Sequence, residues 1–96
     1  MLPGEPFRSG EAKKLIRSIA TGGGTVFWTD HAQDKLTKNY LSVVLGQRCL
    51  KFGVVGEAEF ENGSWRHQVR DPTVTLVVEF TGERELTVVT SWKTER

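Results

Sequence analysis

The sequence has only one cysteine, Cys49, which excludes a disulfide within the chain. One cysteine also excludes zinc-finger spacing. A chain with a single cysteine is compatible with a reducing compartment, and such a cysteine is most often a small buried hydrophobic residue. No apolar run approaches the roughly 18 residues of a membrane span, and the N-terminus lacks the basic-then-apolar order of a signal peptide. We therefore expect a cytoplasmic protein with no membrane contact, no metal site and no small-molecule cofactor.

The chain also has little net charge, +1 at pH 7. Such a charge gives no general attraction to nucleic acid, and no helix-turn-helix pattern is present, so a DNA-binding regulator is disfavoured. The charge is unevenly distributed, with a net of +4 over residues 1–53 and −3 over residues 54–96. The first half of the chain is thus the basic half.

Prolines are few, and two of the three, Pro3 and Pro6, fall in residues 1–8, which we predict to be an extended lead-in. Residues 9–96 are enough for one domain with a modest core. A first helix is predicted to begin at Ser9, with one apolar stripe formed by Ala12, Leu15, Ile16 and Ile19. It ends at residues 21–24, whose three glycines resemble a phosphate-binding loop. Because no Lys-Ser/Thr pair follows them and no strand precedes them, a flexible joint is favoured.

Residues 25–28 are β-branched and aromatic, and they predict a strand at a sheet edge. A second helix begins at Thr29 or Asp30 and turns Ala32 and Leu36 inward. A third helix is predicted over residues 41–52, with Ser42 as its cap. The residues predicted to line its buried face are Leu45, Cys49 and Phe52.

Four short strands joined by tight turns are predicted between Val54 and Trp92. The Asn62-Gly63 turn sets Phe60 against Trp65 on the buried side of a hairpin. A turn at residues 71–72 sets Val69 against Val74. A three-residue loop over residues 82–84 sets Phe80 against Leu86 and Val78 against Val88, which keeps apolar residues on one face.

Alternation then gives the sheet an inner and an outer face. The predicted inner residues are Ala58, Phe60, Trp65, His67, Val69, Val74, Leu76, Val78, Phe80, Leu86, Val88 and Trp92. The predicted outer residues are Glu57, Glu59, Arg66, Gln68, Arg70, Thr75, Glu79, Thr87, Ser91 and Lys93. The predicted fold is α+β, with an antiparallel sheet of four or five strands and two or three helices packed on one face.

The run from Thr29 to Leu36 resembles the His-Ala helix opening of a small bacterial family of unknown function. In that family a second helix ends in glycine, here Gly53, and a Val-Val-Thr-aromatic strand closes the sheet, here residues 88–92. The family is similar in layout to the RelE, BrnT and MqsR ribonuclease toxins of toxin–antitoxin pairs. The strand that begins at Trp65 and the terminal Trp92-Lys93 pair also resemble MqsR. Over about residues 25–93 the resemblance implies a RelE/MqsR-like fold that is either an mRNA-cutting toxin or an inactive relative, with an RNA substrate and an antitoxin partner.

Cleavage of this kind uses the 2′-hydroxyl of the RNA as nucleophile and needs a base, a cation and an acid from the protein, but no metal. The candidate catalytic residues are His31, Arg66, Arg70 and Lys93, and the candidate substrate-binding residues are Lys35, Gln68 and His67. His31 begins a helix, so it serves either as a capping residue or as a phosphate contact and base. With Lys35 and Lys38 it forms a basic stripe.

The inner position of His67 favours a hydrogen-bonded core residue over a catalyst. Arg66 and Arg70 either pair across strands, Arg66 with Glu59, or clamp a phosphate. Strand parity places both arginines and Lys93 on the outer face, whereas His31 comes from the helical side, so these groups converge only around a sheet edge. The alternative function is a non-catalytic protein-binding module that uses the exposed sheet face or the edge strand at residues 26–28.

Overall fold

The computed structural model describes residues 2–95, so the predicted domain ends at residues 1 and 96 lie outside the described residues. The α-helices are α1 (Ser9–Ser18), α2 (Asp30–Lys38) and α3 (Val43–Phe52), and a short π-helical segment, η1 (Ile19–Gly23), follows α1. The strands are β1 (Thr25–Trp28), β2 (Val54–Val55), β3 (Glu59–Glu61), β4 (Ser64–Arg70), β5 (Val74–Gly82) and β6 (Glu85–Lys93). No helix in this part of the chain is both long and apolar enough to cross a membrane.

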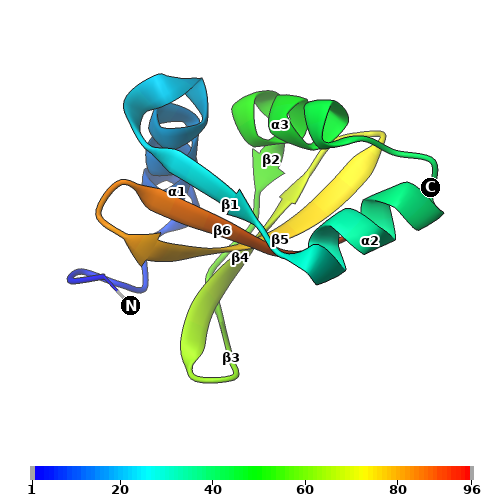
Figure 1. Cartoon of the computed structure of the whole chain (residues 1–96). Coiled ribbons are helices and arrows are strands. Elements are labelled where there is room, and N and C mark those ends of the chain that lie inside the picture. Colours follow the sequence, from blue (N-terminus) through cyan, green and yellow to red (C-terminus); the bar gives the residue numbers. More distant parts are fainter. Residues whose placement is uncertain (1, 96) are drawn as a thin grey trace.

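The strands form an open sheet in the order β1-β6-β5-β4-β2, and β3 pairs with β4 alone. Figure 1 shows α1 and α3 on one side of this sheet, α2 beyond the end of β1, and the β3–β4 hairpin projecting away from the helices. We call the side of the sheet opposite α1 and α3 the open face. The predicted α+β class is confirmed.

The predicted strand count and wholly antiparallel pairing are wrong. The sheet has six strands and is mixed, because β1 runs parallel to β6. The extra strand arises where the predicted first strand of the meander divides into β2 and β3. Between them the chain leaves the regular ladder, and the Gly56 carbonyl bonds the His67 ring instead, at 2.9 Å from Nδ1. The predicted edge position of residues 25–28 is correct.

The helices begin close to where local sequence chemistry placed them. The α1 helix starts at Ser9, and Thr29 rather than Asp30 caps α2, its hydroxyl accepting the Ala32 N–H at 3.0 Å. Ser42 caps α3 as predicted. The predicted buried face of α3 is wrong at Phe52, which is 73% exposed. The residues that α3 buries are Gly46, Cys49 and Leu50.

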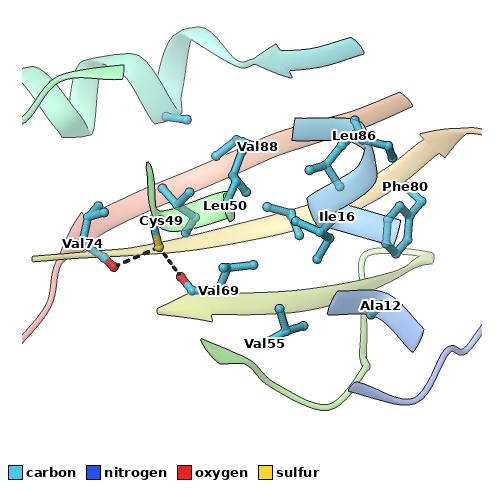
Figure 2. Close-up of a cluster of buried hydrophobic side chains, with 14 of the residues drawn as sticks. Ala12, Ile16, Cys49, Leu50, Val55, Val69, Val74, Phe80, Leu86 and Val88 are labelled. Atoms are coloured by element: carbon cyan, nitrogen blue, oxygen red, sulfur yellow. Dashed lines mark hydrogen bonds between the residues drawn. The ribbon is translucent and has the colours of Figure 1, made fainter. Parts of the chain in front are cut away.

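The core lies between the sheet and the helices, chiefly α1 and α3, and it includes Ala32 and Leu36 of α2. Figure 2 shows Ile16 of α1 and Leu50 of α3 reaching the apolar side chains of the central strands, among them Val88. Cys49 is fully buried here, and its thiol donates to the carbonyls of Val69 and Val74 at 3.4 and 3.5 Å. Burial, with a smaller effect of the Asp71 charge, raises the pKa of the Cys49 thiol to about 12. The cysteine is therefore a neutral core residue and not a nucleophile.

Two of the three predicted turns differ in detail. The Asp71 carboxylate accepts the N–H groups of Thr73 and Val74 at 2.7 and 2.8 Å, which lengthens that turn. Val69 consequently pairs with Leu76 and not with Val74. The shift is two residues, so the faces are preserved.

The last turn keeps its predicted strand pairs. Phe80 faces Leu86 and Val78 faces Val88, as predicted. Gly82 also pairs with Glu85 across a register irregularity, so only two residues remain in the predicted three-residue loop. The register irregularity between Phe80 and Gly82 accommodates the shorter loop, so the apolar residues remain on the predicted face.

The Asn62-Gly63 hairpin has the predicted register, with Phe60 opposite Trp65 and their ring centroids 5.0 Å apart. The prediction that this pair lies on the buried side is wrong for Phe60, which is 56% exposed. The hairpin projects away from the helices (Figure 1), so no helix of the described chain packs on that end of its inner face.

A bulge at Val89 overturns the predicted faces at the end of β6. Val78 pairs with Val88 whereas Val77 pairs with Thr90, so Val89 is an extra residue in β6. Beyond it the parity reverses: Ser91 is fully buried and donates to the Ala32 carbonyl at 2.9 Å, while Trp92 pairs with Thr75 on the open face. The bulge lies where α2 begins, because the Thr29 hydroxyl donates to the Val89 carbonyl at 2.9 Å.

Close packing explains the glycine inside α3. A Cβ at Gly46 would lie 2.5 Å from Cη2 of Trp28, whose ring rests on the helix. We expect Gly46→Ala to lower the free energy of unfolding by about 1–3 kcal/mol in urea titrations, because the ring must move. The matched control is Gly10→Ala in α1, which has open space around it and should stabilise by up to about 1 kcal/mol. Stabilisation by both substitutions would contradict the packing described here.

Candidate nucleic-acid interface

Three rows of side chains cross the open face from β4 through β5 to β6. The rows are Arg66–Glu79–Thr87, Gln68–Val77–Thr90 and Arg70–Thr75–Trp92. The first row continues to Phe27 of β1, which is half exposed. Charge differs along the rows, since the hairpin end carries Arg66 among carboxylates and the Trp92 end carries Arg70.

Trp92 is half-buried and lines three neighbouring hollows of this surface. The first, beside α2, is also lined by Lys35, Asn39, Lys93 and the turn residues 72–73. The second, beside the hairpin, is lined by Glu59, Glu61, residues 66–68, Val77 and Thr90. The third contains Gln68, Arg70 and Thr75, and Thr94 and Glu95 belong to both the first and the third. Trp92 therefore lies between a cationic margin, formed by Lys35 of α2 and Lys93 of β6, and the polar side chains of β4.

Arg66 lies on the open face as predicted, but its charge is already paired. Its guanidinium contacts Glu79 at 3.3 Å and Glu61 at 3.5 Å, and only 16% of its side chain is exposed. Glu59 is its neighbour in register, yet the predicted ion pair with Glu59 does not form among the described residues. Two carboxylates balance this one cation, so the arrangement does not favour Arg66 as a phosphate ligand.

Arg70 shares the open face with Arg66, as the parity argument predicted. Its guanidinium is exposed and donates to the Glu95 carbonyl at 3.3 Å. Lys93 does not share that parity: the Val89 bulge places it opposite the buried Val74, which corrects the prediction of a common surface by alternation. Lys93 still borders the same surface, because at the strand end it lines the first hollow with Lys35.

His31 lies in the first turn of α2 and is exposed. The α2 helix runs alongside the end of β6, since Thr29 contacts Val89 and Ala32 contacts Ser91. Residues four apart share a helix face, so His31 lies on the Lys35 side of α2, one turn nearer its start. His31 lines none of the three hollows, so it reaches the Trp92 surface only around the edge of β6.

His67 is 1% exposed and belongs to the core. Its Nδ1 contacts the Gly56 carbonyl at 2.9 Å, and its ring packs edge-on against Phe80. Within residues 2–95 its Nε2 has no hydrogen-bond partner. This placement agrees with the core-histidine alternative, because the side chain is almost wholly buried although His67 forms part of the lining of the second hollow.

The sequence missed Trp92, Asn39 and Thr90 as members of this surface. Trp92 was assigned to the core by strict alternation, which a single extra residue in β6 reverses. Two consecutive valines before Thr90 were the signal that the alternation fails there.

Among the residues that the structure describes, no group of three or more His, Cys, Asp or Glu side chains is arranged to hold a metal.

Comparisons with known proteins found no match: no family model, no curated protein and no solved structure matches this chain. The open face and its chemistry are therefore the basis for inferring function.

Proposed function

We propose that the protein binds single-stranded RNA on its open face and cuts it without a metal, in the manner of the RelE, BrnT and MqsR toxins. The observation that carries this proposal is the position of Trp92, between a cationic margin and polar side chains. An aromatic ring among cations is the usual surface for single strands, because bases stack on the ring while phosphates meet the charges. An α+β fold with one sheet face left uncovered is also compatible with a RelE/MqsR-like fold.

The phosphate contacts fall to Lys35, Arg70 and Lys93. Among residues 2–95 none of these three forms an ion pair, whereas Lys38 is held by Asp34 at 3.0 Å and Arg66 by two glutamates. Because these cations have no carboxylate partner, they can bind a phosphate without first breaking an ion pair.

In the proposed cleavage reaction, His31 is the general base. A neutral imidazole takes the proton of the 2′-hydroxyl, and the 2′-oxygen attacks the adjacent phosphorus. The P–O5′ bond breaks, leaving a 2′,3′-cyclic phosphate and a 5′-hydroxyl. Lys35 and Lys93 stabilise the charge that develops on the phosphate, and the Lys93 ammonium supplies the proton to the leaving oxygen.

The test of the binding proposal is the salt dependence of affinity for a short RNA. Three phosphate contacts predict a slope of about −2 in a plot of log affinity against log salt, since each contributes about −0.7 for a single strand. The triple variant Lys35→Ala/Arg70→Ala/Lys93→Ala should bring this slope close to zero. Lys13→Ala/Lys14→Ala in α1 is the control of similar charge change and should leave the slope unchanged. An unchanged slope in the triple variant would remove these cations from the site.

A second candidate function is a protein-binding module, and the edge strand β1 favours it. Thr25 and Thr29 donate their N–H groups to Arg84 and Val88, so alternation turns the Val26 N–H and C=O and the Trp28 N–H away from β6. These groups are available to an added strand. The edge is short, and the Gln33 side-chain amide already donates to the Trp28 carbonyl at 3.1 Å. Because few backbone groups remain for an added strand, this function ranks second. A partner of the antitoxin kind would instead place acidic side chains on the RNA-binding cations.

A further inference from the structure

The hollows beside Trp92 have opposite electrostatic character. The hollow toward α2 is lined by Lys35, Lys93 and one carboxylate, Glu95. The hollow toward the hairpin is lined by Glu59, Glu61 and one cation, Arg66, which is already paired with carboxylates. A carboxylate repels phosphate but accepts hydrogen bonds from the N–H groups of a base. An RNA strand on this surface would thus turn its backbone toward α2 and a base toward the hairpin.

Of the two carboxylates that line the hairpin hollow, Glu59 is the one available to a ligand. Glu61 and Glu79 hold Arg66, at 3.5 and 3.3 Å. Glu59 lies opposite Arg66 in the β3–β4 ladder, is exposed, and forms no ion pair or side-chain hydrogen bond among the described residues. Arg66 therefore fixes this rim of the hollow and leaves one carboxylate unoccupied.

We propose that the hairpin hollow is a guanine subsite, with Glu59 and Gln68 reading the base edge and Trp92 stacking on the base. This inference rests on the proposed RNA function. Guanine presents N1–H and N2–H donors side by side, and one carboxylate accepts both. Its neighbouring O6 accepts from the Gln68 side-chain amide, which lines the same hollow.

The other bases present the wrong pattern to this pair of side chains. Adenine and cytosine each place an unprotonated ring nitrogen beside the amino group, and that lone pair repels a carboxylate. Uracil has a single N–H between two carbonyl oxygens, so one carboxylate oxygen faces an acceptor. A paired match of this type discriminates against a wrong base by about 1–3 kcal/mol, so a preference of about tenfold is expected.

The test uses four labelled pentamers of uridine whose central base is G, A, C or U, titrated by fluorescence anisotropy. Wild type should bind the G pentamer about tenfold more tightly than the others. Glu59→Gln should reduce this preference to less than about twofold, because the amide offers one acceptor where the carboxylate offers two, while its affinity for the U pentamer stays close to wild type. Glu83→Gln, in the loop between β5 and β6, makes the same chemical change away from the hollow and should keep the preference.

The outcomes separate the two proposals. Equal affinity of wild type for all four pentamers, or an unchanged preference in Glu59→Gln, overturns the guanine subsite but leaves RNA binding intact. If none of the pentamers binds, the proposed RNA function fails, and the subsite fails with it. A thermal unfolding midpoint like that of wild type shows that Glu59→Gln is folded.

Discussion

Replacing Trp92 with alanine should weaken binding of a short single-stranded RNA by about 10- to 100-fold. Stacking of a base on an aromatic side chain contributes about 1–3 kcal/mol, and Trp92 lines each of the three hollows described on the open face. Trp92→Phe should retain most of the affinity, because a smaller ring still stacks. Fluorescence anisotropy of labelled RNA at fixed salt is the measurement.

The matched control for Trp92 is Phe52→Ala. Phe52 is an aromatic side chain that is 73% exposed, but it lies on α3, on the helical side of the molecule. Its loss should leave RNA affinity within about twofold of wild type. The reverse pattern, with normal binding by Trp92→Ala and weak binding by Phe52→Ala, would place the RNA on the helices and contradict the proposed interface.

The parts of the fold that sequence predicts well are those decided by neighbouring residues. Asn62-Gly63 sets the hairpin register because both residues accept positive φ, and the structure gives them φ of 50° and 82°. Thr29 and Ser42 cap their helices because a side-chain oxygen lies within reach of an N–H three residues on. These features need no information from distant parts of the chain.

The parts that sequence did not predict depend on contacts between distant segments. The Val89 bulge forms where Thr29, 60 residues earlier, donates to the Val89 carbonyl, and the consecutive valines before Thr90 are only a weak local sign of it. Arg66 is paired through Glu79, which a neighbouring strand brings beside it. Both contacts lie at the candidate site. Alternation therefore predicted the face on which Arg66 and Arg70 lie, but it predicted neither the ion pairs of Arg66 nor the position of Trp92 on the open face.

Replacing His31 with alanine should lower the rate of RNA cleavage by about 10²- to 10⁴-fold, the range for loss of a positioned general base. RNA affinity should change little, because Trp92 and the three cations remain. His31 is exposed and Thr29 caps α2, so the thermal unfolding midpoint should stay close to that of wild type. A fall in stability that accounts for the lost rate would support a structural role for His31. Lys38→Ala, on the same helix but paired with Asp34, is the control and should cleave normally.

The central claim is cleavage of RNA by its own 2′-hydroxyl on the open face. Its most direct test is a labelled oligonucleotide that contains one ribonucleotide in an otherwise deoxy strand, incubated with wild-type protein and EDTA. One cut is expected, on the 3′ side of the ribose, leaving a 2′,3′-cyclic phosphate, and the fully deoxy strand should stay intact. Cleavage of the fully deoxy strand, activity that EDTA abolishes, or a bound ribonucleotide strand that is never cut would each contradict this account.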